Sequence, residues 1–315
     1  MKKIIYVTGC LGFIGSHVTR VLLNEGHFVY GIDKETYAAN VNFLTEFNKY
    51  SNFKYQKIDI NDMDSLIECD YIINTAAETH VDNSIIGTNK FIKSNILGVE
   101  NLLNLILTKR HFKFPTFIQF STDEVYGDIL NGSHKEDDIL KPSNPYSASK
   151  ASADMLVLAW GRTYKIPYVI VRPTNNYGIG QYTEKFIPKS CKNLTLGKKI
   201  LLHENGKPVR TWLHVEDTAT AIKHIIDSEK VNEIYNISGN YEDENIQIAK
   251  KILNLFFSNI ENYTDYLDFN FTRIGQDVRY SIDDSKLKNL GWNPIKEFDL
   301  ELSKIVNFYK ENFIW

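Results

Sequence analysis

The sequence predicts an α/β protein built on a doubly wound parallel sheet, with a smaller C-terminal lobe of mixed helices and strands. Short apolar runs that fit buried strands alternate with helical patterns over about the first 170 residues. Such alternation is typical of a parallel sheet covered by helices on both faces. After Pro173 the alternation stops and turn-rich segments follow. We therefore expect a sheet domain over residues 1–173 and a lobe mainly over 174–315, with segments near 211–238 returning to the sheet.

The composition argues against several classes of protein. With 43% hydrophobic and 24% charged residues and a net charge of −3, the chain offers no electrostatic basis for binding nucleic acid or an acidic membrane. Its apolar runs are too short to span a bilayer. Three scattered cysteines, Cys10, Cys69 and Cys191, suit neither a disulfide framework nor a zinc site. We expect a cytoplasmic protein without a metal.

A glycine-rich loop follows the first predicted strand, residues 3–8. Gly9, Gly12 and Gly15 come next, and a helical pattern runs over residues 13–24. Glycines let the backbone turn sharply and approach a pyrophosphate, which the N-terminus of the helix attracts. A glycine triplet alone is a weak signal, but strand, loop and helix stand here in the required order. The loop therefore predicts a dinucleotide-binding sheet of the Rossmann type.

An acidic residue ends the second predicted strand, residues 27–33. Asp33 lies about twenty residues beyond the glycine loop, where a carboxylate accepts hydrogen bonds from the ribose hydroxyls and repels a 2′-phosphate. A solvated aspartate at a strand end is the alternative interpretation. Combined with the glycine loop, the position favours NAD over NADP.

The third and fourth predicted strands also end beside the cofactor. Asp59 and Ile60 follow the third, where an adenine ring would lie. The small residues Ala76 and Ala77 close the fourth and would let the cofactor approach the backbone. His80, in the polar turn that follows, fits a structural hydrogen bonder better than a catalytic group.

Tyr146 and Lys150 stand four residues apart at the start of a helical pattern over 146–164, so their side chains share one helix face. A tyrosine hydroxyl is a poor base at neutral pH because its pKa is near 10. A lysine ammonium beside it, together with a positively charged nicotinamide ring, favours the phenolate. This pair therefore predicts a base for alcohol oxidation.

Two carboxylates, Asp123 and Glu124, follow the predicted strand 116–120. Neighbouring residues of a strand point to opposite faces, so the two share a cavity only if the strand has ended. Gly127 and the polar residues after it favour that ending. Proximity and uneven burial can then keep Asp123 neutral as an acid and Glu124 ionised as a base.

Residues 88–109 form a long helical pattern with apolar residues at helical spacing. Together with the helix at 146–164 it would form a dimer seam, or it would pack on the sheet of its own domain. The sequence leaves both arrangements open.

The motifs at 9–15, 33–38, 76–82, 121–127 and 146–150 resemble those of the nucleoside-diphosphate-glucose 4,6-dehydratases, members of the extended short-chain dehydrogenase/reductase superfamily. The resemblance runs nearly from end to end. The Tyr-x-x-x-Lys pair marks only the superfamily. The Thr-Asp-Glu triplet is more specific, because related sugar epimerases and decarboxylases lack it at this place.

The resemblance implies a reaction on dTDP-glucose or UDP-glucose. Tyr146, helped by Lys150 and Thr122, takes the proton of the 4-hydroxyl while the C4 hydride passes to NAD. Glu124 removes the C5 proton and Asp123 protonates the departing 6-hydroxyl, so that water is lost. The hydride returns to C6, which leaves a 4-keto-6-deoxy sugar and regenerated NAD. A homodimer is also implied.

The resemblance further assigns residues to the two ligands. For the cofactor they are Gly9, Gly12, Phe13, Ile14, Gly15, Asp33, Lys34, Thr36, Asp59, Ile60, Ala76, Ala77, Thr79, Ser94, Tyr146, Lys150 and Asn176. For the substrate they are Thr79, Thr122, Asn175, Lys185, Arg210, Asn236, Arg273 and Gln276. Gln276 stands where many bacterial members carry a histidine, and Ile274 departs from their usual proline. Both departures concern the diphosphate contacts.

Two other functions fit part of the pattern. A nucleotide-sugar 4-epimerase or decarboxylase would keep Tyr146, Lys150 and NAD but would have no use for Asp123 and Glu124. A non-catalytic NAD-binding protein would need neither acid nor base, and the intact set of residues argues against it.

Overall fold

The computed structural model describes residues 1–108, 113–271, 274–275 and 277–312. Among these residues, seven parallel strands form one sheet in the order β10-β6-β5-β4-β1-β2-β3. The strands are β1 (Ile4–Thr8), β2 (Phe28–Asp33), β3 (Phe53–Lys57), β4 (Tyr71–Asn74), β5 (Thr116–Phe120), β6 (Tyr168–Pro173) and β10 (Glu233–Ile237). The predicted doubly wound sheet is therefore present.

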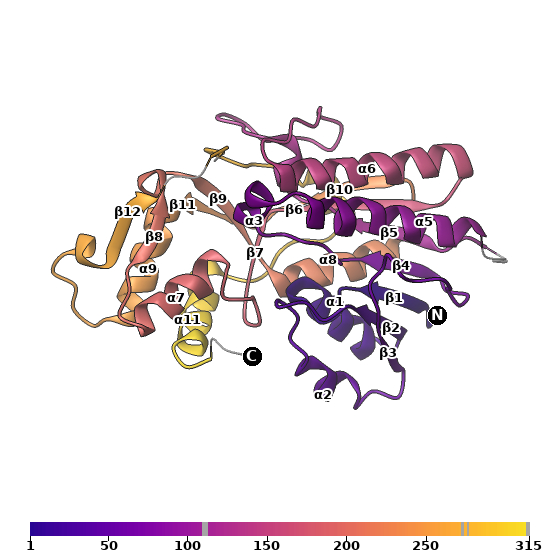
Figure 1. The fold of residues 1–315 in the computed structure, drawn as a ribbon, viewed down its shortest axis with the longest axis horizontal. Coiled ribbons are helices and arrows are strands. Elements are labelled where there is room, and N and C mark those ends of the chain that lie inside the picture. The colour runs from indigo at the N-terminus through magenta and orange to yellow at the C-terminus, as the bar shows by residue number, and fades with distance from the viewer. Residues whose placement is uncertain (109–112, 272–273, 276, 313–315) are drawn as a thin grey trace.

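Helices cover both faces of this sheet (Figure 1). On one face α1 (Phe13–Asn24) packs against α8 (Val215–Ser228), and on the other α5 (Gly98–Thr108) packs against α6 (Pro145–Tyr164). The central strands β4 and β5 are buried along their whole length, and their mostly apolar sequences fit that burial. Their buried polar residues Asn74 and Gln119 satisfy each other through a hydrogen bond of 2.8 Å. A short helix, α2 (Phe43–Phe47), follows β2.

The long helix expected over 88–109 is interrupted. It consists of α4 (Asn89–Phe91), a π-helical turn η1 (Ile92–Leu97) and α5, and a separate helix α3 (Val81–Ile86) precedes it. Inside the π turn, Asn95 is buried, and its carboxamide bonds both the N–H and the carbonyl of Glu78 and the hydroxyl of Ser149. The π turn thus coincides with a buried side chain that is bonded to two other segments of the chain.

The lobe has its own sheets and its own core. In the described part of the chain, β7 (Asn175–Tyr177), β9 (Val209–His214) and β11 (Tyr241–Glu244) form a three-stranded sheet, and β8 (Ile200–His203) pairs with β12 (Leu267–Phe271). Three helices complete it: α7 (Phe186–Thr195), α9 (Asn245–Phe256) and α11 (Phe298–Tyr309). Their apolar residues form a cluster separate from the two that lie on the faces of the large sheet.

The chain crosses between the two parts more than once. After β9 it returns to the large sheet, where α8 covers α1 and β10 pairs with β6. A second return follows β12, because Leu287 of α10 (Ser285–Lys288) and Trp292 join the core beneath α8. The two parts are thus interwoven (Figure 1). Within the described residues, no helix is long and apolar enough to cross a bilayer.

Candidate active site

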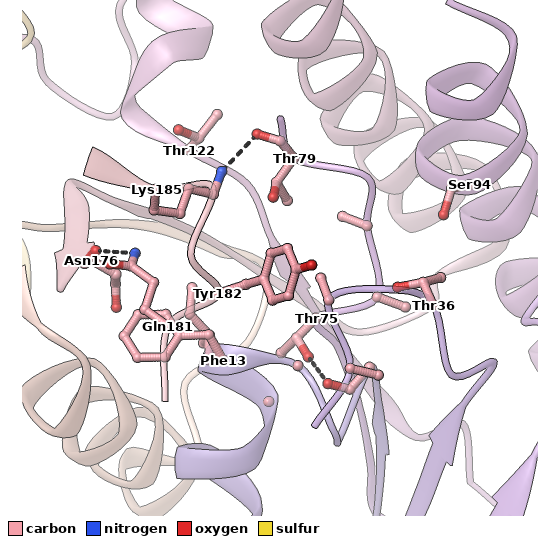
Figure 2. A pocket seen from close by; sticks show the side chains of 18 of the residues that line it. Phe13, Thr36, Thr75, Thr79, Ser94, Thr122, Asn176, Gln181, Tyr182 and Lys185 are labelled. Atoms are coloured by element: carbon pink, nitrogen blue, oxygen red, sulfur yellow. Dashed lines mark hydrogen bonds between the residues drawn. The ribbon is translucent and has the colours of Figure 1, made fainter. Parts of the chain in front are cut away.

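A cleft opens at the carboxyl ends of the strands, between the sheet and the lobe (Figure 2). It is lined from the sheet side by the β1–α1 loop and by the ends of β2 to β5, and from the lobe side by β7 and the segment before α7. All residues predicted for the cofactor line this cleft except Lys150, which lies behind its wall. Ligands of doubly wound sheets bind at this edge.

The glycine loop brings backbone close to backbone. Gly9 has a φ of +70°, and a Cβ there would lie 2.8 Å from the nitrogen of Ala76, so the position requires glycine. Gly12 is the N-cap of α1 and, within the described residues, no side chain caps this helix end. The first turn of α1 contains no acidic residue. The N–H groups at this end face a cleft with no competing carboxylate nearby in the helix. Such an end fits the pyrophosphate of a dinucleotide.

Asp33 ends β2 within the cleft and orders the loops around it. Its carboxylate accepts hydrogen bonds from the N–H of Leu11 at 3.0 Å and of Glu35 at 2.8 Å. Burial raises the pKa of Asp33, and these two bonds oppose the rise. Next to it, the ammonium of Lys34 lies 3.5 Å from the carboxylate of Asp59. The arrangement fits the ribose and adenine end of the cofactor.

Tyr146 enters the cleft from the first turn of α6. Asn144 caps that helix, with reciprocal bonds between Asn144 and Ser147, and Pro145 occupies the first turn. Burial raises the pKa of Tyr146, and the charges of Glu124 and Asp123 add to the rise. One turn further on, burial lowers the pKa of Lys150 to about 8. The pair lies on one helix face, as its spacing predicts.

The strand β5 has ended before the two carboxylates. Thr122 caps a short 3-10 helix, η2 (Asp123–Tyr126), and its hydroxyl oxygen lies 3.1 Å from Oδ1 of Asp123. Asp123 and Glu124 therefore both reach the same cleft. Gly127 follows with a φ of +79°, where a side chain would strain the turn.

The two carboxyl groups differ in environment. Burial raises the pKa of Asp123 to about 7, and the charge of Glu124 adds to the rise. Its Oδ2 is buried and has no hydrogen-bond partner among the described residues. Burial also raises the pKa of Glu124, but Arg210 and a hydrogen bond from Asn144 oppose that rise. Burial thus favours the protonated form of Asp123 near neutral pH, while Arg210 and Asn144 act toward the anion of Glu124.

A second hollow continues from Glu124 into the lobe. Of the residues predicted for the substrate, Thr79, Asn175, Lys185 and Arg210 line it. The ammonium of Lys185 donates to the carbonyl of Thr79 at 3.0 Å across the two parts (Figure 2). Further polar and aromatic residues that sequence reasoning missed also line the hollow or the cleft: Gln181, Tyr182, Lys189, Asn193, Trp212, Asn245 and Tyr280.

Asn236, which the sequence predicts for the substrate, lies away from both cavities in the structure. This residue is fully buried, its Oδ1 accepts from the hydroxyl of Tyr126 at 2.9 Å, and its Nδ2 donates to two backbone carbonyls. It lies in neither the cleft nor the hollow, whereas Asn245 lines the hollow beside Arg210. The predictions for Arg273 and Gln276 concern positions outside the described residues.

His80 is the N-cap of α3, and its Nδ1 accepts from the N–H of Asn83 at 3.4 Å. This is the structural role that the sequence favours for it. Its ring also lies at the margin of the second hollow.

This fold, with its glycine loop and the Tyr-x-x-x-Lys pair beside it, defines a member of the extended short-chain dehydrogenase/reductase superfamily. The chain belongs to the GDP-mannose 4,6 dehydratase family, whose sequence profile matches residues 6–305.

Individual relatives point in the same direction. The chain is 39% identical to the dTDP-glucose 4,6-dehydratase of Haemophilus influenzae, over 98% of each chain. The crystal structure of DesIV, a dTDP-glucose 4,6-dehydratase from Streptomyces venezuelae with NAD bound, matches with a TM-score of 0.91 and 34% identity over 98% of this chain and 97% of that one. The predicted resemblance to the NDP-glucose 4,6-dehydratases is confirmed.

A third similarity separates fold from chemistry. A UDP-glucuronic acid 4-epimerase from Bacillus cereus, solved with UDP-glucuronic acid and NAD, has a TM-score of 0.90 over 98% of this chain and 99% of that one. Its identity is 24%, so this likeness shows the shared fold alone. The reaction has to be argued from the side chains in the cleft.

Proposed function

We propose that the protein is an NAD-dependent dehydratase that converts a nucleoside-diphosphate-glucose to its 4-keto-6-deoxy sugar. The observation that carries this proposal is the placement of Asp123 and Glu124 beside Tyr146 in one cleft. An oxidoreductase or an epimerase acting at C4 needs one base. The loss of water across C5 and C6 needs a further acid and a further base. Two carboxyl groups stand in the cleft for these roles, and although burial raises the pKa of both, Arg210 and Asn144 favour the anion of Glu124.

The cofactor side of the cleft suits NAD. The uncapped end of α1 would hold the pyrophosphate, Asp33 the adenosine ribose, and Ala76 would allow close approach to the backbone. NAD, when bound, supplies the acceptor for the C4 hydride and returns that hydride to C6. Since the sugar oxidised at C4 is the one reduced at C6, the reaction consumes no external reductant.

In the oxidation, Tyr146 takes the proton of the 4-hydroxyl. Its burial disfavours the phenolate, so the reaction depends on groups that offset that effect. The hydrogen bond with Thr122 lowers the pKa of Tyr146. We assign to Lys150, one turn further along the same helix face, the ammonium charge that favours the phenolate during the reaction.

In the dehydration, Glu124 removes the C5 proton, which the new 4-ketone has made acidic. Asp123 donates its proton to the departing 6-hydroxyl, and water leaves. A carboxyl with a pKa of about 7 and an oxygen without a partner among the described residues is suited to donate. Asn144 and Arg210 favour the anionic form that Glu124 needs as a base.

We assign the lobe, mainly residues 174–315, to the nucleotide. Lys185 and Arg210 supply positive charge beside the second hollow, and Asn175 and Asn245 supply amide groups. An arginine fork suits two phosphate oxygens. Because the curated relative at 39% identity is a dTDP-glucose enzyme, we favour dTDP-glucose over UDP-glucose.

We also infer a homodimer. Apolar side chains are exposed on neighbouring helices of one face, namely Ile85 and Ile86 of α3, Ile92 and Leu97 of η1, and Met155 of α6. A second copy of the chain would cover them. Light scattering on the purified protein should give twice the chain mass, and the Ile86→Glu variant should give the mass of one chain.

The function is tested by incubating the purified protein with dTDP-glucose and, separately, with UDP-glucose, followed by mass spectrometry. Loss of one water without net change in NAD would establish the dehydratase and name the preferred nucleotide. If the mass stays unchanged and a galactose epimer forms, the protein is an epimerase instead. No change with either sugar would contradict the proposal.

A further inference from the structure

A buried ion pair lies behind the catalytic side chains. Nε of Arg172, on β6, lies 3.0 Å from Oδ2 of Asp154, and the two side chains are 2% and 0% exposed. Asp154 belongs to α6 and follows Lys150 by one helical turn. Replacing a buried ion pair by apolar residues is often neutral or stabilising, because both charges lose their hydration. Stability alone is therefore a weak reason for this pair.

The pair holds both flanks of the Thr122–Glu124 triplet. Before the triplet, the hydroxyl of Ser121 donates to Oδ2 of Asp154 at 3.0 Å. After it, Nη1 of Arg172 donates to the hydroxyl of Tyr126 at 2.7 Å, and the guanidinium lies 4.8 Å from the centre of the Tyr126 ring. Ser121, just before the turn η2, is therefore bonded to the negative member of the ion pair, and Tyr126, at the end of η2, to the positive member.

The pair also influences the helix that carries Tyr146. Asp154 is the neighbouring charge that opposes the effect of burial on the pKa of Lys150. Its own carboxylate is favoured by Arg172 against burial. One ion pair is therefore linked to Tyr146 and Lys150 through α6, and to Asp123 and Glu124 through η2.

We propose that Asp154 and Arg172 are positioning residues that fix the two acid–base pairs of the dehydratase relative to each other. The inference rests on the proposed function. A sugar that is oxidised at C4 and dehydrated at C5 and C6 without leaving the cleft must meet both pairs in one orientation. A misplacement of about 1 Å can cost about 100-fold in rate. Neither Asp154 nor Arg172 lines the cleft, so both act through other residues.

The test compares Asp154→Leu, Arg172→Met and the double variant Asp154→Leu/Arg172→Met. Each single variant leaves an unpaired buried charge and should lower the melting temperature, and the double variant should recover most of that loss. We expect kcat per NAD-loaded site to remain about tenfold or more below wild type in the double variant, with KM within about twofold. If the double variant recovered kcat as well as melting temperature, the role of the pair would be structural only, and the proposal would be overturned.

Asp217→Asn is the matched control. Asp217 is also buried, and its carboxylate accepts from the N–H groups of Ile295 and Lys296, but it lines neither the cleft nor the hollow. The Asp217→Asn variant should have a lower melting temperature than wild type and an unchanged kcat per NAD-loaded site.

A crystal structure of the double variant gives a readout that does not depend on turnover. We expect η2 to be displaced relative to α6, and an unchanged placement of Glu124 against Tyr146 would overturn the positioning role. Wild-type protein that left both sugars unchanged would contradict the proposed function, and the crystal structure would still decide the role of the pair.

Discussion

Nδ2 of Asn144 lies 3.3 Å from Oε2 of Glu124, while Oδ1 of the same asparagine accepts the N–H of Ser147 and caps α6. One side chain therefore starts the helix that presents Tyr146 and also holds the second carboxylate. The donated hydrogen bond favours the anion of Glu124 against its burial. Glu124, the proposed base for the C5 proton, is thus hydrogen-bonded to Asn144, which caps the helix that carries Tyr146.

We expect Glu124→Gln to stop dehydration while leaving oxidation at C4 largely intact, because a carboxamide cannot accept the C5 proton. Turnover should fall by about 10²–10⁴-fold. Absorbance near 340 nm should rise on addition of sugar, since the reduced cofactor accumulates. Glu297→Gln, at an exposed position, is the control. Unchanged turnover in Glu124→Gln would remove that residue from the mechanism.

Tyr146→Phe should slow hydride transfer itself, because no other residue is assigned to the 4-hydroxyl proton. We expect a loss of about 10²–10⁴-fold and no rise in absorbance near 340 nm. Tyr164→Phe, at the far and exposed end of the same helix, should behave as wild type. Full activity of Tyr146→Phe would assign the base to another group.

Asp123 should make stability fall as the pH rises. Its pKa is raised from 3.8 to about 7, so the folded protein keeps a proton that the unfolded chain has lost. Stability is then lost as the pH climbs through this window, and Glu124 adds to the trend because its pKa is raised as well. Asp123→Asn should have a melting temperature that increasingly exceeds that of wild type from about pH 5 to about pH 8, at the expense of dehydration.

Asp283→Asn tests the sign of that prediction. Hydrogen bonds from the hydroxyl and the N–H of Ser285 lower the pKa of Asp283, so this carboxylate contributes stability at all pH values above its ordinary range and loses it only in acid. Its difference from wild type should stay constant from about pH 5 to about pH 8. A constant difference for Asp123→Asn as well would contradict the raised pKa.

Asp33→Ala should weaken NAD binding by about tenfold or more and reduce the preference for NAD over NADP, because the ribose loses a charged acceptor. The cofactor content of the purified protein and its binding constants for both dinucleotides measure this. Asp62→Ala removes an exposed aspartate outside the cleft and should change neither. Unaltered NAD binding by Asp33→Ala would assign the ribose to another residue.

Most of the sheet and its ligand edge could be predicted from the sequence, since buried parallel strands are continuous apolar runs and the glycine loop has a fixed place between strand and helix. The π turn at η1 could not be predicted, because the contacts that accompany it join Asn95 to Glu78 and Ser149, which are distant in the sequence. The apolar spacing of 88–109 fits a regular helix equally well. The small sheets of the lobe could not be predicted for the same reason, because their strands pair with strands that are distant in the sequence.

The two asparagines show where motif reasoning reaches its limit. Asn236 and Asn245 are nine residues apart in the sequence, and the first stands among apolar residues of a strand. The register of β10 against β6 places Asn236 opposite Arg172. The sequence of either strand alone does not predict this pairing. Asn245, the first residue of α9, lines the second hollow instead.

The position of β10 at the end of the sheet has a consequence for biosynthesis. Three strands of the lobe, β7, β8 and β9, leave the ribosome before β10 does, so β6 remains an open edge until Ile237 has emerged. An unpaired edge recruits other chains. A chain released before Glu233 should therefore aggregate or be retained by chaperones, and it should purify without NAD. The sheet of this protein is thus completed late in synthesis, when β10 pairs with β6.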